Sequence, residues 1–296
     1  MSKWLVAGAA GNLGRDLVAA LAAETDIDLV ATARSELDIT DSAAVRAAVA
    51  GRDLVVNAAA WTDVDGAEGD EAAAFAVNRT GTANIAAACA ESGAVLLQVS
   101  TDYVFAGDAT APYQEDALVG PVNSYGRSKA AGEAVVREFL PDRGFVVRTA
   151  WLYGEHGRNF VATILGAAAE REYLDVVSDV YGQPTWSIPL AQQLTALGRA
   201  ALAGQAAAGA YHGTASGSTT WYGLARAAFE LSGLDPARIR PVTSDSFRRP
   251  ARRPAFSVLG HQAWARAGVA PLGHWRPMLA AALRRPRFAE LQRGAR

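Results

Sequence analysis

Three glycines that directly follow the first apolar run constrain the fold of this 296-residue chain more than any other feature. The run Trp4–Gly8 predicts a buried strand, and Asn12–Ala23 predicts an amphipathic helix that begins at the end of the loop. In such a strand–loop–helix unit, glycines allow a tight turn, the approach of a diphosphate to the backbone, and close packing of the helix on the strand. The loop therefore predicts a dinucleotide site with the pyrophosphate at the helix N-terminus, formed by Gly8, Gly11, Asn12, Leu13 and Gly14.

Strands and helices alternate through the first half of the chain. Apolar runs predict four more strands, and helical patterns lie between them; the strands are Leu29–Ala33, Asp53–Asn57, Ala94–Val99 and Phe145–Arg148, and the helices Ser42–Ala50, Glu71–Glu91 and Ser124–Leu140. Because each strand is apolar along its whole length, both faces of the sheet must be covered. We expect an α/β fold with a Rossmann-like, doubly wound parallel sheet, and a dinucleotide-binding domain over residues 1–150.

After Thr149 the pattern is less regular. It predicts helices at Asn159–Arg171, Ile188–Leu202 and Thr220–Ser232, and strands at Tyr173–Val177 and Gly209–His212. We expect Leu234–Pro254 to be irregular, and His261–Arg293 to form short helices broken by Pro271, Pro277 and Pro286. Residues 151–296 would form mainly a smaller substrate-binding domain, with some segments returning to the Rossmann sheet and the site between the two domains.

The composition excludes several classes of protein. A chain with 50% hydrophobic and 20% charged residues is not disordered. The single cysteine, Cys89, excludes an internal disulfide and fits a reducing compartment. No uninterrupted apolar run reaches the roughly 18 residues of a membrane-spanning helix. We expect a cytoplasmic protein with no membrane partner.

Positive charge is concentrated near the end of the chain. Residues 237–296 contain thirteen arginines and two acids, whereas the whole chain has a formal net charge of −2. Aromatic side chains for base stacking are not interleaved with these arginines at regular spacing, as they would be in many proteins that bind nucleic acid. The pattern therefore favours a small anion such as a diphosphate, and no nucleic acid.

Position 34 bears on the choice of nicotinamide cofactor. In a dinucleotide fold that binds NAD, an acid near the end of the second strand accepts hydrogen bonds from the adenine ribose. Here that position is Arg34, whose guanidinium suits a 2′-phosphate by charge and by geometry. We expect NADPH as the cofactor, with NADH as the alternative, and Asp38 and Ile39 beside the adenine. A solvated surface arginine is the other interpretation of Arg34.

Tyr125 and Lys129 are four residues apart at the start of a predicted helix and therefore lie on one face of it. Lys129 is one of only two lysines, the other being Lys3. A free phenol has a pKa of about 10, and an ammonium one turn away should lower this pKa, which would suit Tyr125 to proton transfer. Ser100 and Thr101 end the fourth strand, where a hydroxyl can bond a substrate carbonyl oxygen. Together with the glycine loop, this set predicts hydride-transfer chemistry.

Short motifs spread over nearly the whole chain carry a family resemblance. They are Asn57–Ala60, Thr62–Glu68, Val77–Asn78, Ser100–Phe105, Tyr125–Lys129, Arg148–Tyr153, Tyr181–Thr185 and Arg253–Leu259. With these motifs the chain resembles the dTDP-4-dehydrorhamnose reductase family of extended short-chain dehydrogenase/reductases. The resemblance implies an NAD(P)H-dependent oxidoreductase that reduces the 4-keto group of a nucleotide-linked 6-deoxyhexose, in deoxysugar biosynthesis.

The resemblance also implies roles for individual residues. Thr101, Tyr125 and Lys129 would be the catalytic residues, and Asn78 would support the site. Cofactor binding would involve Ala60, Trp61, Thr62, Tyr125 and Lys129, and binding of the nucleotide-sugar would involve Thr101, Asp102, Trp151 and Arg253. Of these, Arg253 would contact the diphosphate, which agrees with the basic C-terminal stretch.

The sequence departs from the family pattern at a metal site. Some members form a dimer bridged by a divalent metal that glutamates hold. Here Asp16 keeps an acid on the first helix, but Trp186–Pro189 contains no glutamate where those relatives have one. The four histidines lack ligand spacing; they are His156, His212, His261 and His274. We therefore expect no bound metal and disfavour a metal-bridged dimer; a homodimer of another kind stays open.

Two other interpretations of these motifs stay open. A nucleotide-sugar epimerase of the same superfamily shares Tyr125 and Lys129, but it would retain oxidised nucleotide, whereas a reductase exchanges NADPH freely. A non-catalytic, NADP-binding regulatory subunit, like that of methionine adenosyltransferase, resembles the same family, and the intact catalytic set argues against it. A 4,6-dehydratase is disfavoured because Thr101 is followed by Asp102 and Tyr103, without the usual second carboxylate.

Overall fold

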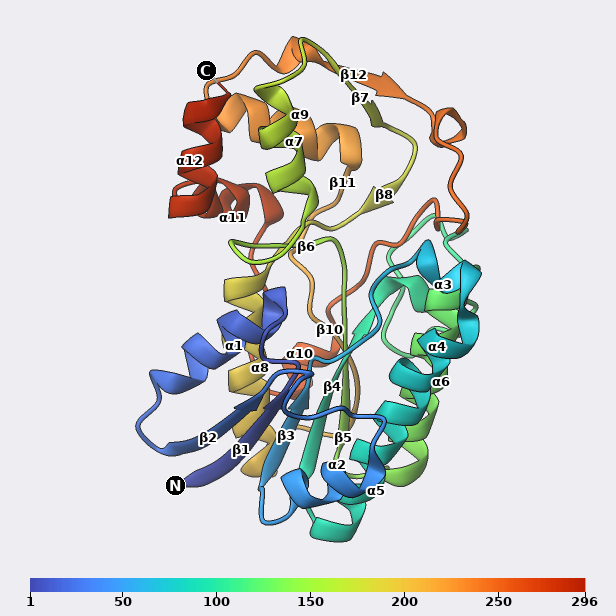
Figure 1. Ribbon diagram of the computed structural model, residues 1–296, viewed down its shortest axis with the longest axis vertical. Helices are drawn as coiled ribbons and strands as arrows, with labels where there is room; N and C mark the ends of the chain where they lie inside the picture. Colours follow the sequence, from blue (N-terminus) through green and yellow to red (C-terminus); the bar gives the residue numbers. More distant parts are fainter. Residues whose placement is uncertain (296) are drawn as a thin grey trace.

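Six parallel strands form the central sheet of the computed structural model, which describes residues 1–295 (Figure 1). Their order is β10-β5-β4-β3-β1-β2, so the chain moves from β1 to opposite sides for β2 and β3 and leaves a crevice at their carboxyl ends. The strands are β1 (Ser2–Ala7), β2 (Ile27–Thr32), β3 (Leu54–Asn57), β4 (Val95–Thr101), β5 (Gly144–Thr149) and β10 (Gly209–His212). The predicted Rossmann-like α/β fold is confirmed. Arg296, with which the expected second domain ends, lies outside the described residues.

Helices cover both faces of the sheet, as the continuously apolar strands predict. Side chains that alternate along β1 enter different cores: Trp4 and Val6 pack with one layer of helices, and Leu5 and Ala7 with the other. The first layer contains α1 (Asn12–Ala22) and α8 (Ser187–Leu202), and the second contains α2 (Ser42–Val49), α5 (Thr82–Ser92) and α6 (Ser124–Phe139). Among residues 1–295, no helix combines the length and apolar character needed to cross a membrane.

The helix expected over Glu71–Glu91 is present and runs without a break over residues 71–92, but it contains a π-helical turn that the pattern did not predict. Its parts are α4 (Glu71–Phe75), the π-helical turn η1 (Ala76–Gly81) and α5, and a short α3 (Gly66–Gly69) precedes it. The wider turn packs against Gly132 of α6, where a Cβ would lie only 2.4 Å from the Asn78 carbonyl oxygen. Asn78 lies in this turn, and its side chain bonds groups outside the helix. Such π turns often occur at functional sites.

The second half of the chain builds a smaller region above the carboxyl ends of the strands (Figure 1). Its core is formed by α7 (Phe160–Ala168), α9 (Trp221–Leu231), α11 (Trp275–Ala282) and α12 (Pro286–Gly294). Short strands pair beside these helices: β6 (Leu152–Tyr153) with β9 (Thr185–Trp186), β7 (Leu174–Val177) with β12 (Ile239–Val242), and β8 (Tyr181–Gly182) with β11 (Thr219–Thr220). Two elements of this half, α8 and β10, belong to the Rossmann layers, and α10 (Ala263–Arg266) packs near β10.

Two expectations for the C-terminal part are wrong. The stretch expected to be irregular contains β12, in which Pro241 is tolerated because the pairing with β7 is only two-stranded and leaves a free edge. Pro277 does not break a helix, because it lies in the first turn of α11, where its missing N–H is not needed. Pro286 similarly begins α12 at its first position.

Many of the C-terminal arginines are bonded to other parts of the chain. Arg276 pairs with Glu230 at 2.9 Å, and Arg285 pairs with Glu155 at 2.6 Å. Arg238 donates to three backbone carbonyl groups, at 2.6, 2.8 and 3.0 Å. The local excess of positive charge is therefore partly used to join the second region together.

Candidate active site

A cavity of about 700 Å³ lies in the crevice at the carboxyl edge of the sheet. With the exception of Arg253, every residue predicted to bind cofactor or substrate lines this cavity: Gly8, Gly11, Asn12, Leu13, Gly14, Arg34, Asp38, Ile39, Ala60, Trp61, Thr62, Thr101, Asp102, Tyr125, Lys129 and Trp151. These residues come from several loops and from the starts of two helices, α1 and α6. The fold therefore brings together groups as far apart in the sequence as Gly8 and Trp151.

The glycine loop has the geometry that a bound diphosphate requires. Gly8 has φ of 84°, and a Cβ there would lie 2.5 Å from the backbone nitrogen of Ala59. A Cβ on Gly14 would nearly touch the Gly8 carbonyl oxygen, so only glycine lets α1 begin this close to β1. No side chain caps the N-terminus of α1. Its first amide groups are therefore left for an anionic ligand.

The other end of the cavity contains a free cation. Arg34 is exposed and makes no hydrogen bond or ion pair with any residue of the described part of the chain. Asp38 accepts from the Thr40 backbone N–H at 2.9 Å, and such bonds to Thr40, with a smaller effect of the Arg34 charge, lower the pKa of Asp38. The Ile39 side chain is buried and packs against Gly81, which has no side chain to obstruct it. This end thus offers an apolar wall and one unpaired guanidinium.

Asn78 holds the loop after β3 from behind. Its Oδ1 accepts from the Trp61 backbone N–H at 2.9 Å, and its Nδ2 donates to Ser128 Oγ at 2.9 Å. Asn78 is not among the cavity-lining residues, whereas Trp61 is. Asn78 therefore supports the site without lining it, whereas Val77 of the same π turn does line the cavity.

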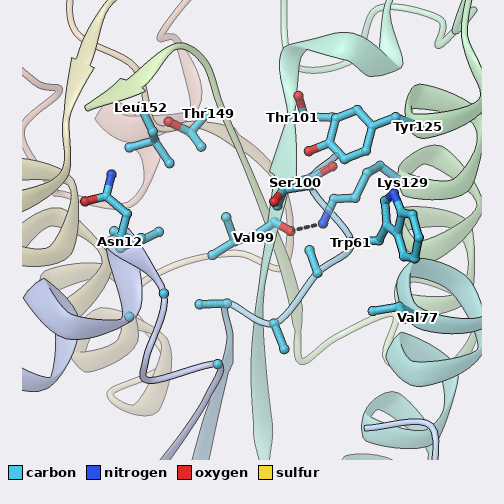
Figure 2. Close-up of a pocket in the computed structure, with 18 of the residues that line it drawn as sticks. Asn12, Trp61, Val77, Val99, Ser100, Thr101, Tyr125, Lys129, Thr149 and Leu152 are labelled. Atoms are coloured by element: carbon cyan, nitrogen blue, oxygen red, sulfur yellow. Dashed lines mark hydrogen bonds between the residues drawn. The ribbon is translucent and has the colours of Figure 1, made fainter. Parts of the chain in front are cut away.

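Tyr125 and Lys129 project from the start of α6 into the cavity, and Figure 2 shows them beside Thr101 and Val99. Asn123 fixes the start of this helix, because its Oδ1 accepts from the Gly126 N–H at 2.7 Å. Lys129 Nζ donates to the Val99 carbonyl oxygen at 2.7 Å (Figure 2). Burial lowers the pKa of Lys129 to about 8, against the opposing effect of the Glu133 charge.

The pKa of Tyr125 moves in the direction opposite to the one expected. Burial raises the pKa of Tyr125 above its ordinary value; a hydrogen bond with Thr101 works against this rise, and the Asp102 charge adds to it. The expected lowering of this pKa by the Lys129 ammonium is not among the causes of the shift, in which burial is the largest. Tyr125 is therefore a neutral phenol near pH 7, the form that can donate a proton.

Thr101 and Asp102 form a buried hydroxyl–carboxylate pair at the end of β4. Thr101 Oγ1 donates to Asp102 Oδ1 at 3.0 Å and accepts from the Tyr103 N–H at 3.2 Å. Ser257 Oγ donates to Asp102 Oδ2 at 2.6 Å. Burial raises the pKa of Asp102 to about 6, although these hydrogen bonds favour its charged form. The Thr101 hydroxyl is thus bonded to Asp102, and it also hydrogen-bonds the Tyr125 side chain.

Ser100, the other hydroxyl at the end of β4, is directed away from this chemistry. Its Oγ donates to Glu133 Oε1 at 2.6 Å. Glu133 also pairs with the buried Arg148 at 2.8 Å, and Arg148 contacts His212 Nε2 at 3.3 Å. Burial lowers the pKa of His212 to about 3. This network is a buried support beneath the site, and it holds the hydroxyl of Ser100, which also lines the cavity.

Trp151 lies in a stack of aromatic rings that the sequence did not reveal. It stacks on Trp221, with ring centroids 3.5 Å apart and planes 9° from parallel, and both rings line the cavity. A Cβ on Gly182 would lie 2.4 Å from the Trp151 ring. Trp221 is the first residue of α9. In the sequence it is only an aromatic residue at the start of a helix, which does not predict a place in the site.

The structure differs from the sequence-based expectation in which arginine lines the cavity. Arg253 does not line the cavity; it forms a bidentate pair with Asp65, at 2.7 and 2.8 Å. Arg158 does line the cavity and has no hydrogen bond or ion pair within residues 1–295. The adjacent Gly157 lies against Asn12 at the start of α1, and Arg287 bonds the Gly157 carbonyl oxygen at 2.7 Å. The sequence offered no motif that would have singled out Arg158.

The carboxylate of Asp16 is hydrogen-bonded to a serine side chain. Its Oδ2 accepts from Ser187 Oγ at 2.5 Å, and His156 Nε2 lies 3.7 Å from its Oδ1. Ser187 belongs to the segment that lacks the glutamate. Within residues 1–295, no group of three or more histidine, cysteine or acidic side chains is arranged to hold a metal ion.

Sequence relatives cover nearly the whole chain. A family model described as RmlD substrate binding domain matches residues 2–288. The chain is 53% identical to a dTDP-4-dehydrorhamnose reductase of Streptomyces griseus, over 94% of this chain and 91% of that protein. It is 49% identical to a dTDP-4-keto-6-deoxy-D-glucose reductase of Streptomyces niveus, over 92% of this chain and 93% of that protein.

A solved structure is similar over the same length. The dTDP-4-dehydrorhamnose reductase of Bacillus anthracis, crystallised in complex with NADP, superposes with a TM-score of 0.88 at 33% sequence identity. The match covers 96% of this chain and 99% of that one. The likeness therefore includes both the Rossmann layers and the smaller region.

Proposed function

This chain belongs to the dTDP-4-dehydrorhamnose reductase (RmlD) family of extended short-chain dehydrogenase/reductases, and from that premise we propose how its own residues perform the reaction. The protein is a dTDP-4-keto-6-deoxyhexose 4-reductase of deoxysugar biosynthesis, an oxidoreductase whose substrate is a nucleotide-sugar. The observation that carries the proposal is that one cavity contains the glycine loop, Tyr125, Thr101 and Lys129.

The residues of the cavity fit a nicotinamide dinucleotide. The uncapped start of α1 and the glycine positions that exclude a Cβ suit a pyrophosphate. We propose that Ala60, Trp61 and Thr62 line the cofactor and that Asp38 and Ile39 lie beside its adenine. The family uses NAD(P)H, and the free guanidinium of Arg34 favours NADPH, because only that form carries a 2′-phosphate. When bound, the reduced cofactor supplies the hydride.

Tyr125 acts as the general acid. Because its pKa is raised, Tyr125 carries its proton at neutral pH and can deliver it to the C4 oxygen of the sugar. Thr101 holds the Tyr125 hydroxyl by a hydrogen bond and places it next to that oxygen. Lys129 presents a buried ammonium to the ribose side of the cavity, which also favours negative charge developing on the reacting oxygen.

The nucleotide-sugar lies toward the smaller region. We propose that Trp151 packs on the sugar ring and that Asp102 borders its hydroxyl groups. The diphosphate is the expected partner of Arg253, and Arg158 is a further free cation on the cavity wall for diphosphate groups. A homodimer stays a prediction. A cytoplasmic location stays a prediction.

The test is an assay of NADPH oxidation with a panel of dTDP-4-keto-6-deoxy sugars. A reductase oxidises NADPH in step with loss of the keto sugar and releases NADP after each turnover. A protein that retains oxidised nucleotide through purification and interconverts epimers without net NADPH use would be an epimerase instead. Binding of NADPH without turnover of any sugar would support the regulatory-subunit interpretation.

A further inference from the structure

Ser257 lies 155 positions after Asp102 in the sequence but beside it in space. Its side chain is buried, and its Oγ donates to Asp102 Oδ2 at 2.6 Å. Backbone bonds hold the segment on both sides: the Ser257 N–H donates to the Tyr181 carbonyl oxygen at 3.0 Å, and the Phe256 N–H donates to the Gly107 carbonyl oxygen at 3.0 Å. Ser257 is therefore a fixed donor and does not adjust freely to its partner.

Asp102 transmits this constraint to Thr101. An ionised carboxylate only accepts hydrogen bonds, so the hydroxyl protons of Ser257 and Thr101 both point at Asp102. The Thr101 oxygen also accepts from the Tyr103 N–H. The same hydroxyl lies beside the Tyr125 side chain and hydrogen-bonds it (Figure 2). The chain of contacts thus runs from Ser257 through Asp102 and Thr101 to the general acid.

We propose that Ser257 is a positioning residue that acts through Asp102 to hold the Thr101 hydroxyl in the orientation in which it contacts Tyr125. No bond to Ser257 breaks in the reaction, and its proton stays on its oxygen. The inference rests on the proposed function only in that Thr101 and Tyr125 act together on the reacting oxygen. The segment that contains Arg253 and Ser257 therefore has a second role, which is to position residues at the end of β4 in the Rossmann domain.

The charges around Asp102 make this role sensitive to pH. Within residues 1–295 no cation forms an ion pair with Asp102: Lys129 on α6 is bonded to Val99, and Arg253 on the same segment as Ser257 is paired with Asp65. Tyr103 and Tyr125, which also face it, have raised pKa values and are neutral. Hydroxyl and backbone donors therefore keep Asp102 charged, and the Ser257 bond is foremost among the contacts that lower its pKa.

The experiment compares Ser257→Ala with wild type in steady-state turnover from pH 5 to 9. We expect kcat at pH 7 to fall about 10-fold, which corresponds to about 1.4 kcal/mol of barrier. The acidic limb of the kcat profile should move up by about one pH unit, because Asp102 is protonated more easily. KM for NADPH should stay within about twofold. Ser187→Ala is the matched control, since Ser187 is an equally buried serine that donates to Asp16 outside the cavity, and it should leave the limb unmoved.

A double-mutant cycle tests whether Ser257 acts through Asp102. In an Asp102→Asn background, Ser257→Ala should change kcat by less than about twofold, and no acidic limb near pH 6 should remain. An equal effect of Ser257→Ala in both backgrounds, or an unmoved acidic limb, would overturn the proposal. If Ser257→Ala fails to fold, Ser257→Cys keeps a weaker donor and should shift the limb in the same direction. Absence of any acidic limb in the wild-type profile would also overturn it.

The two proposals fail in different ways. If Tyr125→Phe abolishes turnover while Ser257→Ala behaves as wild type, only the role of Ser257 is wrong. If Tyr125→Phe retains turnover, the proposed catalytic arrangement itself is wrong, whatever the Ser257 variant does.

Discussion

Trp221 stacks on Trp151 with ring centroids 3.5 Å apart, and the two residues are separated by 70 positions in the sequence. Trp151 is the only non-glycine residue with positive φ in the part of the chain that the structure describes, at 45°. Such a conformation costs roughly 1–3 kcal/mol and persists where surrounding contacts hold it. Trp221 is one of these contacts, so the orientation of the predicted sugar-binding ring depends on a helix of the smaller region.

Removal of Trp221 should therefore weaken sugar binding. Aromatic pairs contribute about 0.5–1.5 kcal/mol beyond their buried area, so Trp221→Ala should raise KM for the nucleotide-sugar about 2- to 10-fold. KM for NADPH should change little. Trp221→Phe keeps a stacking ring and should recover most of the loss. A sugar KM equal to that of wild type in Trp221→Ala would show that Trp151 is held without its neighbour.

Tyr125→Phe removes the proton donor and nothing else. Positioned acid–base groups contribute about 10²–10⁴-fold in rate, and we expect a loss of kcat in that range. Cofactor affinity, measured by fluorescence titration with NADPH, should be retained because the ring remains. A variant within threefold of wild-type kcat, with chemistry rate-limiting, would remove Tyr125 from the mechanism.

The dependence of kcat/KM on pH should reflect the titration of Lys129. Burial lowers its pKa to about 8, so the ammonium is present below that pH and is lost as the pH rises through it. We expect kcat/KM to decline above about pH 8. In Lys129→Met, which removes the charge, activity should be about 10²–10³-fold lower and without this alkaline limb. A limb that begins only above pH 10 would point to Tyr125, whose pKa is raised, and not to Lys129.

Arg34 should decide between the two nicotinamide cofactors. We expect wild-type kcat/KM to favour NADPH, because the free guanidinium of Arg34 can pair with the 2′-phosphate. Arg34→Asp should reverse the preference, since it repels that phosphate and offers acceptors to the ribose hydroxyls of NADH. Arg15→Ala is a suitable control, because Arg15 is a nearby arginine that donates to the Ala10 carbonyl oxygen and lies outside the cavity lining. Equal use of both cofactors by wild type and mutant would show that Arg34 does not select the cofactor.

The pair of Arg253 and Asp65 permits a direct test of diphosphate binding. If Arg253 contacts the diphosphate, Arg253→Ala should raise KM for the nucleotide-sugar with little change in kcat, by about 10-fold or more. Asp65→Asn breaks the ion pair but keeps the guanidinium, and it should leave KM unchanged or lower it. The same rise in KM for both variants would mean that Arg253 only anchors its loop.

The fold and much of the site were predictable because their signals are local. The turn at Gly8 and Gly14, the apolar alternation of strands and helices, and the spacing of Tyr125 and Lys129 each depend on a few neighbouring residues. Parallel strands then bring their carboxyl ends to one edge of the sheet, which is why the predicted residues meet in one cavity. The π-helical turn inside the helix expected over Glu71–Glu91 was not predicted, because helical periodicity does not register a packing partner such as Gly132.

Only the tertiary structure determined the protonation states, the ion pairs and the contacts between residues far apart in the sequence. It paired Arg253 with Asp65, placed Trp221 on Trp151 and directed Ser257 at Asp102, all across separations for which one sequence carries no signal. It also raised the pKa of Tyr125, where the sequence predicted a fall, because burial and the nearby Asp102 charge outweigh the hydrogen bond with Thr101. The sequence by itself determined the backbone framework and the kind of chemistry, since these follow from local patterns. The protonation states and the identity of the free cations follow from desolvation and pairing, which exist only once the chain is folded.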